Sequence, residues 1–132
     1  MSGGSTIYAN SKGAAGTVKV TATFTGDVYL DSVQRDGVCV MGNVTFTPCA
    51  RTYWHRHDGG QVLRVLAGSG WICDKGGEPR MLKTGDTVYA APGTVHWHGA
   101  DDNSVMTHFA IGIGHTEWLD AVSDEDYNAK GK

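Results

Sequence analysis

The sequence predicts an all-β fold, a barrel or sandwich of short strands followed by one short helix. Three observations support this prediction. Nineteen of the 132 residues are glycine, about twice the usual share of ~7%. Short apolar or alternating runs recur from residue 17 to residue 113, and glycine, asparagine or aspartate separates them. That region contains no run with the 3.6-residue periodicity of a helix.

Each predicted strand is a run that alternates between apolar and polar residues or is continuously apolar. In chain order the runs are 17–23, 38–46, 50–57, 61–66, 70–73, 80–82, 87–90, 96–99 and 105–113. Turns are expected where glycine permits positive φ or proline presets a turn. They are Asp58-Gly59-Gly60, Lys75-Gly76-Gly77, Thr84-Gly85-Asp86 and Pro92-Gly93.

The helix is predicted at the end of the chain. Ser123 can cap a first turn in which three acidic residues face the positive end of the helix. The expected organisation is a loose glycine- and serine-rich segment over residues 1–16, one domain over 17–130, and a frayed tail at 130–132.

Composition excludes several functional classes. The apolar runs are far shorter than the roughly 20 residues needed to cross a bilayer, so no membrane partner is expected. The net charge is −3 and basic residues form no cluster, which argues against a nucleic-acid partner. Three widely spaced cysteines without a CxxC pair argue against a disulfide framework. The first residues carry no secretory signal, so a cytoplasmic location is expected.

Histidines are the main indication of chemistry, because five of the six lie between residues 55 and 108. His55 and His57 share one face of their strand, about 7 Å apart along the backbone, so both rings can approach one ion. The following turn reverses the chain and brings Gln61 within reach of the same point. A third imidazole, that of His96, has to come from elsewhere in the fold.

The last long strand is apolar on both faces. His108 and Ala110 share one face, while Phe109 and Ile111 share the other. The outer face of a small barrel normally contacts solvent and is polar. Because this outer face is apolar, an N-terminal strand or a second subunit is expected to cover it. We therefore predict a homodimer or homotetramer.

Two stretches resemble the cupin family. The segment 42–70, with His55-Arg56-His57, Gln61, Gly68 and Gly70, resembles the first cupin motif. The segment from Gly85-Asp86 to Pro92-Gly93-Thr94-Val95-His96 resembles the second. The resemblance implies a single jelly-roll barrel with His55, His57, Gln61 and His96 as metal ligands. Gln61 departs from the family pattern, in which this ligand is usually glutamate.

Within the cupins, residues 50–57, Gln61, 96–100 and 106–108 resemble the manganese-dependent bacterial hydroxynitrile lyases. This resemblance implies a lyase that cleaves a cyanohydrin into hydrogen cyanide and an aldehyde or ketone. It also favours manganese, although the ligand types alone would equally suit iron, nickel, cobalt or zinc.

The replacement of a carboxylate by the neutral Gln61 has a physical consequence of its own. The metal keeps its full positive charge, which makes it a stronger Lewis acid and stabilises an anion in the reaction. The change also shifts expectation away from iron and oxygen chemistry. An iron dioxygenase and a non-catalytic, metabolite-binding cupin remain the alternatives.

His108 is the candidate acid or base, because it faces inward and a nearby cation would keep it neutral. The alternation of side chains along the strands also predicts which residues face inward, and these would form a pocket for a small hydrophobic or aromatic substrate. Its expected lining is Gly42, Val44, Tyr53, Leu63, His98, Ala110 and Gly112. Parity leaves open whether His98 acts directly or lies beside the ligands. It also points Arg51 inward, where a carboxylate could pair with it.

Overall fold

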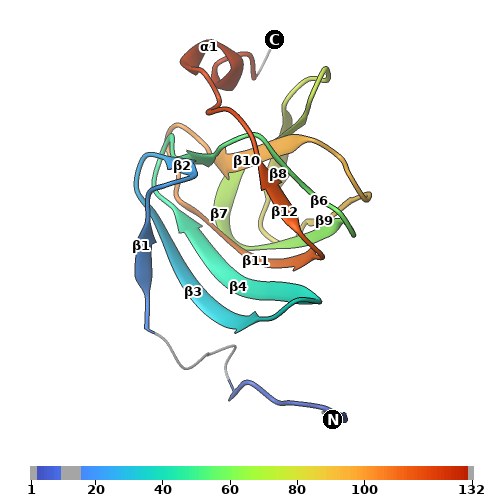
Figure 1. Ribbon diagram of the computed structural model, residues 1–132. Helices are drawn as coiled ribbons and strands as arrows, with labels where there is room; N and C mark the ends of the chain where they lie inside the picture. The colour runs from blue at the N-terminus through green and yellow to red at the C-terminus, as the bar shows by residue number, and fades with distance from the viewer. Residues whose placement is uncertain (1–2, 10–15, 131–132) are drawn as a thin grey trace.

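The computed structural model describes residues 3–9 and 16–130. Their strands form one twelve-stranded sheet that curls into a nearly closed jelly-roll barrel (Figure 1). The predicted all-β class is therefore confirmed. The loose segment expected over 1–16 and the tail expected at 130–132 lie partly outside the described residues.

The elements follow one another with short connections. They are β1 (Val18–Val20), β2 (Phe24–Thr25), β3 (Val28–Arg35), β4 (Cys39–Phe46), β5 (Arg51–Thr52), β6 (His55–His57), β7 (Gln61–Asp74), β8 (Arg80–Lys83), β9 (Thr87–Ala90), β10 (His96–Ala100), β11 (Met106–Ile113), β12 (Thr116–Trp118) and α1 (Asp124–Tyr127).

The long strand β7 belongs to both halves of the barrel. Its first part pairs with β11 and β9, and β4, β3 and β1 continue that half. Its second part pairs with β10 and β8, and β5, β6, β2 and β12 complete the other half. The strand bends at Gly68, which has a φ of 73° and where a Cβ would overlap the carbonyl oxygen of Val105.

The structure corrects the predicted strands in several places. The runs 61–66 and 70–73 are one continuous strand, β7. The run 50–57 is two strands, β5 and β6, separated by an irregular step at Tyr53 and Trp54. Strands β2, β3 and β12 were not predicted. In β3 a bulge between Ser32 and Gln34 breaks the alternation, and β12 is only three residues long.

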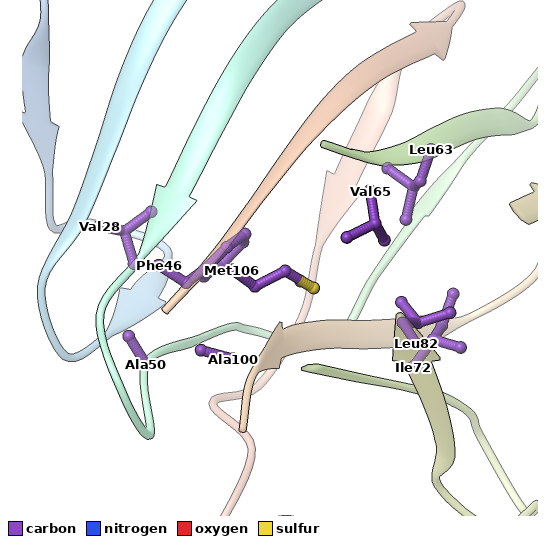
Figure 2. Close-up of a cluster of buried hydrophobic side chains, with 9 residues drawn as sticks. All are labelled: Val28, Phe46, Ala50, Leu63, Val65, Ile72, Leu82, Ala100 and Met106. Atoms are coloured by element: carbon purple, nitrogen blue, oxygen red, sulfur yellow. The ribbon is translucent and has the colours of Figure 1, made fainter. Parts of the chain in front are cut away.

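The apolar core lies between the two halves, at one end of the barrel. Figure 2 shows its buried side chains from both halves, with Phe46 and Met106 close together. The members are Val28, Phe46, Ala50, Leu63, Val65, Ile72, Leu82, Ala100 and Met106. This packing holds the strands that carry the histidines in a fixed register.

The C-terminal segment covers the outside of β10. The predicted cap is confirmed, since the Ser123 hydroxyl oxygen accepts the backbone N–H of Asp126 at 3.0 Å. Tyr127 then packs in a second apolar cluster with the fully buried Trp97. Its hydroxyl donates to the carbonyl oxygen of Ala100 at 2.7 Å.

Removing that hydroxyl should weaken the fold. The substitution Tyr127→Phe leaves a buried carbonyl without its donor, so the free energy of unfolding should fall by about 1 kcal/mol. Urea unfolding followed by circular dichroism measures the change. The exposed Glu125 on the same helix supplies the control, Glu125→Gln, which should change stability by less than about 0.5 kcal/mol. Equal stability of Tyr127→Phe and the unaltered protein would contradict this role.

The outer face of β11 is apolar, as predicted. Phe109 and Ile111 are half-buried there, and Leu66 and Tyr89 on neighbouring strands are exposed. The homodimer or homotetramer expected to cover this face stays a prediction, which sedimentation equilibrium would test. Among the described residues, no helix is long and apolar enough to span a membrane.

Candidate metal centre and its cavity

A cavity of about 780 Å³ opens between the two halves of the barrel. Of the residues predicted to line it, Gly42, Val44, His98, Ala110 and Gly112 do so. His55, His57, Gln61 and His108 also contribute to its wall. The cavity therefore joins the predicted pocket to most of the histidine cluster.

Two residues predicted to line the cavity lie elsewhere. The irregular step at residues 53–54 shifts the alternation by one residue, so Thr52 faces the cavity and Tyr53 does not. Leu63 faces inward but is fully buried in the apolar core. The same step turns Arg51 away from the barrel interior. Its guanidinium then pairs with the carboxylate of Asp124 at 2.8 Å. The inward orientation predicted for Arg51 is wrong, and the pairing with a carboxylate is confirmed.

Neighbouring strands bring the histidines together. His55 on β6 lies directly opposite His96 on β10 in the strand register, and their ring centres are 4.6 Å apart. A ring nitrogen from each of His55, His96 and His98 lies within 4.8 Å of the other two. The His57 ring lies edge-on beside that of His55, with centres 5.2 Å apart. Four imidazoles thus surround one small volume.

Gln61 lies among these rings. Its Oε1 lies 2.9 Å from Nε2 of His96. The same side chain lies near the rings of His55 and His57 and raises the pKa of both. The side chains of the four predicted ligands therefore contact one another, although His98 also belongs to the group of closest ring nitrogens.

Burial keeps these imidazoles neutral. It is the largest cause that lowers the pKa of His96 to about 4, and it lowers that of His55 well below its usual value. Burial likewise lowers the pKa of His57, an effect that the nearby Gln61 side chain partly opposes. The buried polar residues of the described chain include no Asp or Glu. The site therefore offers neutral nitrogen and oxygen donors at pH 7.

This donor set fits a divalent metal ion. Nε2 of His57 and Nε2 of His98 are buried without a hydrogen-bond partner in the described part of the chain. Leaving such atoms unpaired is costly, and for Nε2 of the proposed ligand His57 the arrangement suits an ion that would bind it. Donors bound at about 2.1 Å to one ion lie about 3 Å apart, which is close to the 2.9 Å between His96 and Gln61.

His98 and His108 form a second pair at the base of the cavity. Nε2 of His108 and Nδ1 of His98 are 3.0 Å apart and share a hydrogen bond. Both rings are buried, and burial lowers the pKa of His108 to about 4. Nδ1 of His108 has no partner among the described residues. His108 is thus a neutral imidazole with one unpaired ring nitrogen.

Sequence reasoning missed several residues of the cavity wall. Phe24, Trp118 and Thr116 all line it. Trp118 stacks on His55 with ring centres 4.6 Å apart and lies 5.6 Å from Phe24. The alternation in Thr116-Glu117-Trp118 was the available signal, but a run of three residues is too short to distinguish a strand from a loop.

Comparison with known proteins places these observations among relatives. Residues 42–112 match the family model described as "Cupin domain". The chain is 44% identical over 112 residues to a protein named (R)-mandelonitrile lyase from Granulicella tundricola. The aligned region covers 79% of this chain and 85% of the relative.

Solved structures agree on the fold. A cupin-like protein from Thermotoga maritima is 36% identical and superposes with a TM-score of 0.82 over 92% of this chain and 96% of its own. A cupin 2 conserved barrel domain protein from Rhodopseudomonas palustris is 18% identical, with a TM-score of 0.63 over 83% and 77% of the two chains. The second likeness bears on the fold alone.

Proposed function

Because this chain belongs to the cupin family, we propose that it is a metal-dependent lyase that cleaves a cyanohydrin into hydrogen cyanide and an aldehyde or ketone. One observation carries the proposal: a cluster of neutral histidines with a glutamine forms the wall of a cavity, in a chain 44% identical to a mandelonitrile lyase. No carboxylate belongs to that cluster, which suits a Lewis-acid site better than oxygen chemistry.

The proposed ligands are His55, His57, Gln61 and His96. The position of Gln61 supports this set, because its Oε1 lies 2.9 Å from Nε2 of His96 and its side chain lies near the rings of His55 and His57. His98 is the competing ligand by proximity, but its Nδ1 is engaged with His108. Manganese is the proposed metal on the resemblance, while the donor types also suit iron, nickel, cobalt or zinc.

The proposed reaction moves one proton out and back. A bound divalent ion would supply Lewis acidity for the negative charge that develops. His108 accepts the hydroxyl proton of the cyanohydrin at Nδ1, and the oxygen electrons form the carbonyl bond. The bond between the two carbon atoms breaks, and its electron pair leaves with cyanide. The imidazolium of His108 then returns the proton and releases hydrogen cyanide.

The cavity wall supports a small hydrophobic or aromatic substrate. Phe24, Phe46 and Trp118 contribute aromatic surface, and Val44 and Ala110 contribute small apolar side chains. Gly42 and Gly112 add no side chain. The apolar part of the wall suits the phenyl ring of an aromatic cyanohydrin, and the charged Arg35 and Asp36 also line the cavity.

Narrowing this wall should change substrate preference. Ala110 lies on the cavity wall opposite Gly42 on the neighbouring strand, so Ala110→Leu would add side-chain volume at this wall. We expect KM for mandelonitrile to rise by about tenfold or more, and KM for the smaller acetone cyanohydrin to change less. Steady-state kinetics on the manganese-loaded protein, with metal content as a control, measures both values. An equal effect on the two substrates would contradict the proposed pocket.

The activity itself is tested by a paired assay. Metal analysis of protein expressed without supplement identifies the native ion, and release of benzaldehyde from mandelonitrile is then followed with and without air. The proposal predicts equal cleavage in both conditions. Turnover that requires air would instead indicate an iron dioxygenase. Inactivity in both, with retained binding of benzaldehyde, would indicate a metabolite-binding protein.

A further inference from the structure

Strand β12 pairs residue by residue with the strand that carries the histidine pair. The register joins Thr116 to His57, Glu117 to Arg56 and Trp118 to His55. Each side chain on β12 also contacts the side chain of its partner. We propose that β12 is a brace that orients His55 and His57 for metal binding, an inference that rests on the metal centre proposed above.

The contact between Thr116 and His57 determines which nitrogen is available. Oγ1 of Thr116 lies 3.0 Å from Nδ1 of His57, while Nε2 of His57 is buried without a partner among the described residues. When Nδ1 carries the proton and donates to Thr116, the lone pair of His57 is at Nε2. The hydroxyl can accept this proton from Nδ1, and the contact limits rotation of the ring so that Nε2 faces the metal centre.

His55 is oriented from two directions. Its Nδ1 donates to the carbonyl oxygen of Tyr53 at 2.9 Å, because a carbonyl can only accept, and this leaves the lone pair at Nε2. Trp118 lies against the ring, tilted by 35°, with the centres 4.6 Å apart. Trp118 is 39% exposed and His55 only 1%, so the indole lies between the imidazole and solvent.

The third cross-strand pair supplies a control on the same strand. Nε of Arg56 donates to Oε1 of Glu117 at 2.6 Å, and both side chains are more than two-fifths exposed. This pair lies on the face away from the cavity, since neither residue lines it. An exposed ion pair of this kind contributes little to stability. Removing it should leave β12 in place and the two histidines oriented.

Metal affinity of the intact protein tests the brace directly. The metal is removed by chelation, and Mn²⁺ is titrated back while free Mn²⁺ is followed by electron paramagnetic resonance. Thr116→Val keeps the shape of the side chain but removes the hydroxyl, and should weaken affinity by about 10- to 100-fold. Thr116→Ser restores a hydroxyl and should recover most of that loss. Glu117→Gln should remain within about twofold of the unaltered protein.

A spectroscopic measurement separates orientation from loss of fold. Co²⁺ loaded in place of Mn²⁺ should give a visible absorption spectrum that changes in Thr116→Val and returns in Thr116→Ser, while the melting temperatures of the two variants agree. For Trp118, the conservative Trp118→Phe should keep Mn²⁺ affinity and Trp118→Ala should lower it. Unchanged affinity and spectrum in Thr116→Val would overturn the inference.

His57→Ala distinguishes failure of the brace from failure of the metal centre. If His57→Ala binds Mn²⁺ as tightly as the unaltered protein, the proposed ligand set is wrong. If His57→Ala loses the metal while Thr116→Val retains full affinity, the ligand set stands and only the brace is wrong. Loss of affinity in both, with recovery in Thr116→Ser, supports the two together.

Discussion

Replacing His96 with alanine should remove bound metal and turnover together. His96 is fully buried at the centre of the cluster, with its Nε2 2.9 Å from Oε1 of Gln61 and its ring 4.6 Å from that of His55. Loss of a direct ligand should cost more than the roughly 10- to 100-fold in metal affinity that outer contacts contribute. Metal content after dialysis and mandelonitrile cleavage by the same sample measure both effects.

His98→Ala is the matched comparison for this experiment. It removes an equally buried imidazole two residues further along β10, and the proposed ligand set predicts that the metal is retained. Thermal melting of both variants shows whether the barrel is intact. If His98→Ala loses the metal and His96→Ala keeps it, His98 rather than His96 is the ligand from β10.

The second large effect is expected at His108. The substitution His108→Ala should leave metal content unchanged and lower kcat for mandelonitrile by about 10²- to 10⁴-fold, the usual contribution of a positioned acid or base. The reason is that Nδ1 of His108 has no other partner in the described chain and the ring lines the cavity. Metal analysis and steady-state kinetics on one preparation separate the two roles.

Thr107→Val is the control for His108→Ala. Thr107 is the preceding residue on β11, and its hydroxyl bonds to that of Thr45 at 3.0 Å on the outer face. Changing it alters the same strand without touching the cavity. Turnover that survives in His108→Ala would show that another group accepts the proton.

Most of the architecture could be predicted because its signals are local. Alternation predicted β4, β9, β11 and most of β10, and the serine cap with its acidic first turn predicted the helix. The two histidines at alternate positions of β6 are likewise brought to one face, as a strand requires. These features depend on the period of the backbone, which is readable from a few residues.

The rest depends on contacts between distant segments. The irregular step at Tyr53 and Trp54 places the side chain of Arg51 on the opposite side of the strand from the one predicted. A prediction from alternation assumes an unbroken strand. The partnership of Thr116 with His57 joins residues 59 positions apart, and no local pattern encodes it. Similarly, alternation along the strand correctly predicted that the Leu63 side chain faces inward. Only packing decides that it fills the apolar core instead of lining the cavity.

The central claim is that His55, His57, Gln61 and His96 bind one ion. Anomalous diffraction at the manganese edge, from crystals of the manganese-loaded protein, measures this directly. The account predicts a single peak within about 2.3 Å of Nε2 of His55, His57 and His96 and of Oε1 of Gln61. A peak bound by His98 in place of His57, or no peak at this cluster, would contradict it.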